Sequence, residues 1–128
     1  SMNSEDKLKS ISKIQWKGGN LVPQLIPIEK IDLAGQSVNG LLEWWKQEKK
    51  PESVRFRFGN DEEALKYFPN HYYEKLEKDW ENESVRINVP LDLILMGEKY
   101  HVEDGWHRLA LCYLHNVKLV PAIVEIPK

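Results

Sequence analysis

The stretch that decides the fold lies near the C-terminal end, at residues 91–126, LDLILMGEKYHVEDGWHRLALCYLHNVKLVPAIVEI. Residues 91–96 are almost wholly apolar and predict a buried strand. Gly97-Glu98 predicts a two-residue hairpin turn, because glycine supplies the positive φ that such turns need. Residues 99–103 then predict a returning strand. The C-terminal third of the chain is therefore expected to begin with a hairpin.

A helix is expected to follow the hairpin, from about Gly105 to His115. Its packed side carries Leu109, Cys112 and Tyr113. Asn116 is a suitable left-handed stop, and residues 119–126 predict a final strand. Strands interleaved with a helix indicate an α/β (α+β) domain with a mixed sheet flanked by helices.

Toward the N-terminus, residues 21–31 are apolar but contain Pro23 and Pro27, which predicts an edge strand followed by an irregular turn. Ser37 is expected to cap a helix. The apolar residues of that helix recur at helical spacing, at Val38, Leu41, Leu42 and Trp45.

The middle of the chain is less regular. Alternation over residues 54–58 predicts a short strand, and residues 61–68 are expected to be helical. Asn70 is expected to cap another helix, one face of which carries Tyr73, Leu76 and Trp80. Residues 85–89 alternate before Pro90 and are expected to be extended.

Length and composition indicate one domain, over residues 21–128, after a flexible segment at 1–20 whose first two residues are a tag remnant. With 41% hydrophobic and 30% charged residues, the chain has the composition of a globular protein. No apolar run is long enough to cross a membrane. A single cysteine, Cys112, favours a reducing compartment, so we expect a cytoplasmic protein. A net charge of −2 gives no support to DNA as a partner.

The turn Glu103-Asp104-Gly105-Trp106-His107-Arg108 carries the functional prediction. A helix N-terminus is electropositive, yet two cationic residues fall in its first turn, at a cost of roughly 0.3–1 kcal/mol each. A bound anion would remove this conflict, because Gly105 allows close approach and Arg108 can grip two phosphate oxygens. A structural interpretation stays open, in which Asp104 caps the helix and pairs with Arg108 while Glu103 neutralises His107.

Residues 102–126, from Val-Glu-Asp-Gly-Trp-His-Arg to Val-Pro-Ala-Ile-Val, resemble the signature segment of the ParB/sulfiredoxin superfamily. Residues 88–91 and 25–31 are also similar to the family's hairpin approach and first strand, whereas residues 50–84 show no such match. The resemblance implies a small ParB/sulfiredoxin-like domain that binds ATP or CTP with Mg²⁺. Gly105, His107 and Arg108 would then contact phosphate and Asp104 would line the pocket.

Departures from the family pattern limit the activity that can be expected. Trp106 stands where sulfiredoxin needs its cysteine, which argues against sulfinic acid chemistry, although an indole there can stack on a ligand. Cys112 has the pattern of a buried core residue. Chromosome-partitioning ParB proteins carry an arginine pair in place of His107-Arg108 and a further DNA-binding domain.

Free-serine kinases of the superfamily have an Asp-Gly-x-His-Arg turn like this one and a carboxylate base near the first strand. The resemblance therefore makes Glu29 and Asp32 candidate bases, with Glu103 a weaker one and Asp104 a candidate Mg²⁺ ligand. The expected function is an ATP-binding domain that acts as an ATPase or phosphotransferase on a hydroxyl acceptor, which would be a small molecule or a protein. Two alternatives stay open: a DNA-binding or nuclease-like protein, and a non-catalytic protein-interaction module.

Overall fold

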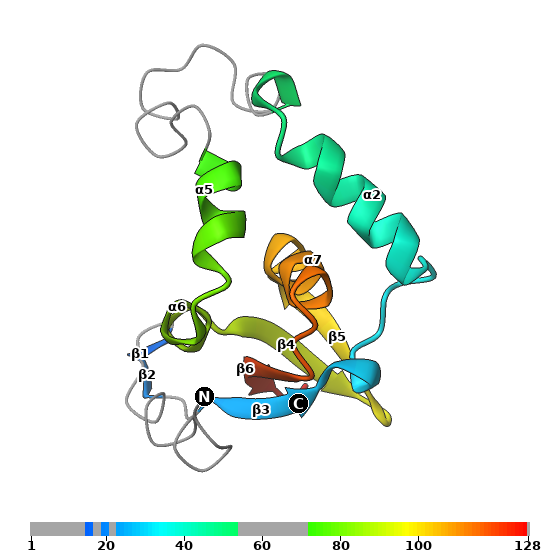
Figure 1. The fold of residues 1–128 in the computed structure, drawn as a ribbon. Coiled ribbons are helices and arrows are strands. Elements are labelled where there is room, and N and C mark those ends of the chain that lie inside the picture. Colours follow the sequence, from blue (N-terminus) through cyan, green and yellow to red (C-terminus); the bar gives the residue numbers. More distant parts are fainter. Residues whose placement is uncertain (1–14, 17–18, 21–22, 54–71, 128) are drawn as a thin grey trace.

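The computed structural model describes residues 15–16, 19–20, 23–53 and 72–127. Its main sheet has four strands in the order β3-β6-β4-β5, and helices α2, α5, α6 and α7 pack on one side of it (Figure 1). The predicted mixed sheet with flanking helices is thus confirmed. Among the described residues, no helix is long and apolar enough to cross a membrane.

The central hairpin follows the sequence prediction. Strands β4 (Leu91–Met96) and β5 (Lys99–Asp104) pair antiparallel around a turn in which Gly97 has φ +64°. The ladder shifts register between Asp92 and Leu93, which face Asp104 and Val102, so Glu103 is the extra residue of a β-bulge. The bulge lies at the end of β5, immediately before the helix that carries the candidate site.

Strand β6 (Leu119–Glu125) completes the sheet by pairing on both of its sides. It runs parallel to β4 and antiparallel to β3 (Gln24–Pro27), which lies at the edge of the sheet. The short 3-10 helix η1 (Ile28–Lys30) follows β3 directly. The predicted edge strand and irregular turn are both present, as expected where prolines remove ladder donors.

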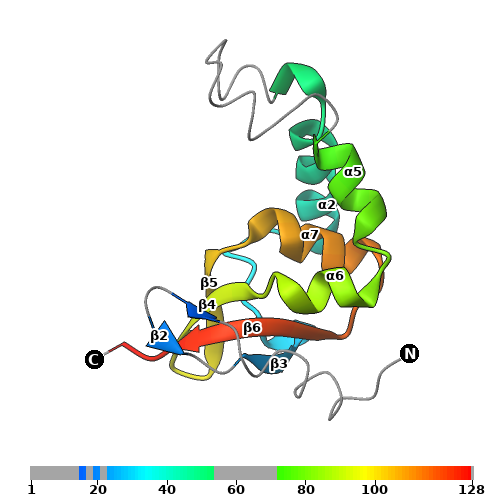
Figure 2. The same ribbon diagram turned by 90° about the vertical axis from the view of Figure 1, so that its left-hand side faces the viewer.

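Helix α7 (Trp106–Leu114) crosses the sheet between β5 and β6, as Figure 2 shows. Four residues of this helix are fully buried in the core cluster: Leu109, Ala110, Leu111 and Cys112. Asn116 ends the helix with φ +56°, the left-handed conformation expected of it. This helix is the centre of the core, so the position of its first turn is set by packing along its whole length.

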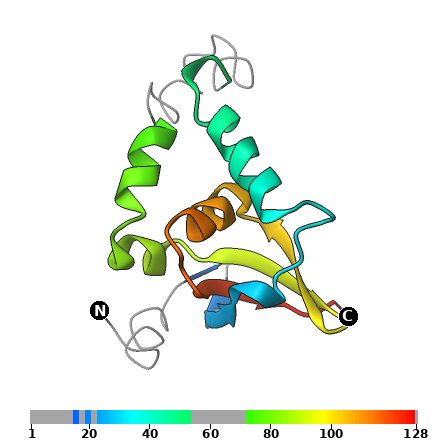
Figure 3. The ribbon, with the colours of Figure 1, turned by 45° about the vertical axis from the view of Figure 1, so that its right-hand side comes forward.

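Helices α2 (Val38–Glu48) and α5 (Tyr72–Asp79) lie on either side of α7 (Figure 3). Ser37 caps α2 as expected, its Oγ accepting from the amide of Gly40 at 2.9 Å. Glu77 on α5 ties the two helices together. Its carboxylate accepts from Trp45 Nε1 at 3.0 Å and from Lys49 Nζ at 2.8 Å.

Helix α6 (Glu83–Asn88) corrects the expectation of an extended segment over residues 85–89. The alternation is real in the sequence, but Asn82 caps a helix by accepting from the amide of Ser84 at 3.0 Å. Ile87 is buried, and Arg86 donates to the carbonyl of Trp80 at 2.6 Å. Capping and tertiary contacts therefore override the two-residue period.

A two-stranded ladder that was not expected from the sequence joins β1 (Gln15–Trp16) and β2 (Gly19–Asn20). The expected strand at 54–58, the helix at 61–68 and the cap at Asn70 lie outside the described residues. The helix that Asn70 was expected to cap is α5, where Tyr73 is buried as predicted and Trp80 is buried just beyond its end.

Candidate functional site

The turn between β5 and α7 depends on a glycine. Gly105 has φ +121°, a conformation that side chains disfavour, and it is the N-cap of α7 without a side chain to cap it. A Cβ at this position would lie 2.8 Å from Leu91 Cγ and 3.2 Å from Arg108 Nη2. The backbone is therefore packed tightly here, and no acidic residue lies in the first turn of the helix.

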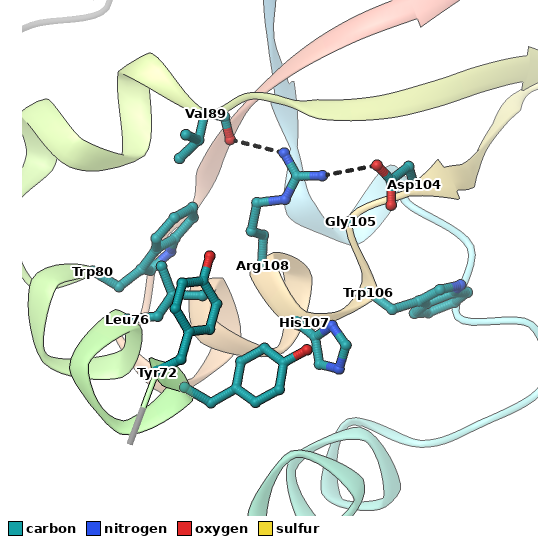
Figure 4. A pocket seen from close by; sticks show the side chains of 10 residues that line it. Tyr72, Leu76, Trp80, Val89, Asp104, Gly105, Trp106, His107 and Arg108 are labelled. Atoms are coloured by element: carbon teal, nitrogen blue, oxygen red, sulfur yellow. Dashed lines mark hydrogen bonds and ion pairs between the residues drawn. The ribbon is translucent and has the colours of Figure 1, made fainter. Parts of the chain in front are cut away.

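A recess of about 390 Å³ opens at this turn, between the start of α7 and helix α5 (Figure 4). On one side of Arg108 stand Tyr72, Leu76 and Trp80, and on the other side stand Asp104 and Gly105. The recess thus joins an aromatic wall to an electropositive helix terminus. Its full lining is Tyr72, Tyr73, Leu76, Trp80, Val89, Asp104, Gly105, Trp106, His107 and Arg108.

The guanidinium of Arg108 lies in the recess but is held by the protein. Nη1 donates to the carbonyl oxygen of Pro90 at 2.6 Å and to that of Val89 at 3.3 Å. Nη2 lies 3.4 Å from Oδ2 of Asp104, whose side chain is 74% exposed. One edge of the guanidinium is therefore anchored to the backbone, while the other faces a solvated carboxylate that can move away.

His107 is turned from the mouth of the helix toward α2. Its ring stacks on Trp44 and on Tyr73, with centroids 4.8 Å and 4.9 Å away, and Nε2 lies 3.1 Å from Oε1 of Glu48. The edge of Trp45 also meets it. The structure thus places His107 in the wall of the recess as a contact between three helices, whereas the resemblance implied a phosphate contact.

The other residues of the motif divide between the recess and the surface. Asp104 and Trp106 line the recess, and Trp106 also lines a smaller hollow with Gln36 and Trp44. Glu103 is exposed on the bulge. The expected neutralisation of His107 by Glu103 is not what the structure shows, because Glu48 from α2 takes that place.

Glu29 and Asp32 are not brought to this recess. They line a separate hollow of about 340 Å³ with Lys99 and Tyr113. Asp32 bonds through its amide to the carbonyl of Tyr100, four residues before Asp104, a distance of about 13 Å along a strand. The Asp32 carboxylate lies 3.4 Å from His101 Nδ1. In the same hollow, burial and the nearby charge of Glu29 raise the pKa of Tyr113.

The side chains that line the recess do not form a metal site by themselves. Among the described residues, no group of three or more His, Cys, Asp or Glu side chains is placed to hold a metal ion. Asp104 is the one carboxylate among the residues that line the recess. Any Mg²⁺ here would have to arrive with the phosphates of a nucleotide, with Asp104 as its protein ligand.

Tyr72, Leu76, Trp80 and Val89 complete the recess and were not predicted to be site residues. The sequence signal for Tyr73 and Trp80 was helical spacing, which predicted core positions, and both are indeed buried. That signal says nothing of a cavity beside the core. Only the arrangement of α5 beside the start of α7 brings these side chains to the motif.

Cys112 is fully buried, as its sequence pattern predicted. Burial raises the pKa of its thiol to about 11, partly opposed by the neighbouring Trp80 indole and by the charges of Arg86 and Arg108. A thiol with so high a pKa is not a nucleophile at neutral pH.

Comparison with protein-family models, with curated proteins and with solved structures gave no match to this chain.

Proposed function

We propose that the recess at the start of α7 binds the phosphate of a nucleotide, with ATP as the first candidate, and that the chain is a ParB/sulfiredoxin-like nucleotide-binding domain. The observation that carries the proposal is the meeting of three features in one hollow: the uncapped N-terminus of α7, the guanidinium of Arg108 and an aromatic wall. The motif resemblance gives the same assignment from the sequence.

The electrostatics favour an anion at the mouth of the helix. The first turn of α7 contains no acidic residue, and Gly105 offers no side chain to its amides. The helix dipole and Arg108 both favour negative charge there. A phosphate can replace the exposed carboxylate of Asp104 beside Nη2, while Nη1 keeps its bonds to the backbone.

The opposite side of the recess suits a flat ring. Tyr72 is 36% exposed, and Leu76 and Val89 continue the apolar surface beside it, while Trp80 is buried behind them. A base that stacks on such a wall gains about 1–3 kcal/mol. A nucleotide therefore matches the recess better than inorganic phosphate alone.

Placement of the carboxylates bears on turnover. Glu29 and Asp32 lie in the other hollow, and Glu103 and Asp104 are the acidic residues of the motif itself. This arrangement favours binding over phosphoryl transfer, and it supports the alternative of a non-catalytic interaction module that keeps a nucleotide site. If transfer does occur, Asp104 and Glu103 are the nearest candidates for positioning a proton or a metal ion.

Isothermal titration calorimetry with ATP, ADP and CTP, with and without Mg²⁺, tests the proposal. Arg108→Ala should weaken binding at least ten-fold, since a charge-assisted hydrogen bond contributes about 1.5–3 kcal/mol. Lys75→Gln is the matched control, because Lys75 is an exposed cation on α5 that pairs with Asp79 outside the recess. Circular dichroism shows whether each variant folds, and Arg108→Lys serves if the alanine variant does not.

Equal binding by parent and Arg108→Ala would refute this site, as would heat signals absent for all three nucleotides. Loss of affinity in both Arg108→Ala and Lys75→Gln would indicate only attraction by net charge.

A further inference from the structure

His107 is placed to act on the proposed nucleotide site without touching the ligand. It lies in the first turn of α7, where a bound anion would sit, yet its ring is clamped between Trp44 of α2 and Tyr73 of α5. Its Nε2 lies 3.1 Å from Oε1 of Glu48, and its side chain is 28% exposed. Through its ring, the start of α7 contacts both neighbouring helices.

We propose that His107 is a positioning residue whose protonation is coupled to anion binding in the recess. The inference rests on the proposed function, because it needs an anion at the start of α7. A protonated ring would form an ion pair with Glu48 and place its charge against two aromatic faces. It would also hold the first turn of α7 rigidly against α2.

The charges around His107 oppose each other when the recess holds no ligand. Glu48 from α2 favours the protonated ring, and Lys49, the next residue, is bound to Glu77. Tyr73 from α5 contributes its ring face. On its own helix, the neighbouring Arg108 and the helix N-terminus disfavour a second positive charge.

A phosphate bound at the start of α7 would remove the repulsion that Arg108 and the helix N-terminus exert on a protonated His107. Its negative charge offsets Arg108 and the helix terminus, so the protonated form of His107 gains stability. Linkage is reciprocal, and the anion therefore binds more tightly when His107 is protonated. Histidine is the side chain whose charge changes within the physiological pH range, so a pH titration can reveal the coupling.

Nuclear magnetic resonance titration of the histidine ring protons tests the coupling in the full chain, with ADP as the probe. The His107 signal is identified by its loss in His107→Gln or by elimination from the other three histidines. Saturating ADP should raise the titration midpoint of His107 by about half a pH unit or more, as expected for a phosphate charge several ångströms away. His101 is the internal control, because it lies beside Asp32 in the other hollow, and its midpoint should not move.

The variant Glu48→Gln distinguishes an effect of Glu48 through His107 from the direct repulsion between the Glu48 carboxylate and a bound anion. Removal of a negative charge near the recess should by itself strengthen ADP binding. If His107 acts as proposed, Glu48→Gln instead weakens ADP about two- to five-fold at pH 6, at the lower end of measured couplings. Glu43→Gln on the same helix is the control and should not weaken ADP, because Glu43 is exposed and pairs with Lys46.

The outcomes are distinct. If ADP perturbs no signal of the protein, the proposed function fails and this inference fails with it. If ADP perturbs signals of the recess but leaves the His107 midpoint unchanged, or if Glu48→Gln strengthens binding, the nucleotide site stands and the coupling is refuted.

Discussion

Leu91 occupies the space that a Cβ on Gly105 would need, with Leu91 Cγ 2.8 Å from that position. The first residue of β4 thus sets how closely the backbone before α7 approaches the sheet. The same glycine has φ +121°, so two independent constraints act on one residue.

Gly105→Ala should lower the free energy of unfolding by about 2–4 kcal/mol, from backbone strain and overpacking together. Urea unfolding followed by circular dichroism measures it. Gly97→Ala is the control, because Gly97 has φ +64° but nothing lies within 4 Å of its Cβ position. That variant should lose about 1–2 kcal/mol, from the left-handed backbone conformation alone. Equal losses in the two variants would show that Leu91 does not constrain the turn.

Asp104→Asn should change ligand binding more than stability. Asp104 is largely exposed and 3.4 Å from Arg108, so losing the pair should cost under about 1 kcal/mol. Without Mg²⁺, ADP should bind several-fold more tightly, because a competing carboxylate leaves Nη2. With Mg²⁺, this increase in ADP affinity should become smaller or turn into a decrease if Asp104 is a ligand of the metal.

Calorimetry of Asp104→Asn in chelator and in Mg²⁺ measures both effects, beside Glu103→Gln as a variant with the same loss of charge on the neighbouring bulge. A similar gain in both variants would mean that Asp104 has no specific relation to Arg108.

The buried thiol of Cys112 predicts a pH dependence of stability. Its pKa is raised from 9.0 to about 11 in the folded protein, so the folded state keeps its proton where the unfolded state loses it. This contribution is complete below pH 9 and is lost as the pH rises toward 11, by up to about 1.4 kcal/mol per unit.

The measurement is urea unfolding of the parent and Cys112→Ala at pH 8, 9 and 10. The difference in free energy between them should be constant up to pH 9 and then fall, since other groups titrate equally in both proteins. A constant difference at all three values would contradict burial of the thiol.

Strong local signals predicted most of the sheet. The Gly97 turn, the apolar run of β4 and the prolines beside β3 each depend on a few neighbouring residues, and all three elements formed as expected. The error at residues 85–89 has the opposite origin. Five alternating residues suit a strand, but a cap at Asn82 and the burial of Ile87 favour a helix instead. The cap is local, whereas the burial of Ile87 depends on distant parts of the chain.

The candidate site was predicted in part, because one motif carried it. Asp104, Gly105, Trp106, His107 and Arg108 were expected to lie around one hollow, and all five line the recess. Orientation could not be predicted: His107 points to α2 because Trp44, Tyr73 and Glu48 offer it better contacts than the helix mouth does. Glu29 and Asp32 follow the first strand as expected, but the path of η1 takes them to Tyr100 and Tyr113.

The pairing of β3 has a consequence for how the chain is assembled. Among the described strands, β3 has β6 as its one neighbour, and the ladder joins Pro27 to Leu119, 92 residues later. During synthesis, β3 remains without its ladder partner until Leu119 and the residues after it have been translated. A ribosome that stalls before residue 119 would leave that edge segment without its neighbour and available to quality-control factors.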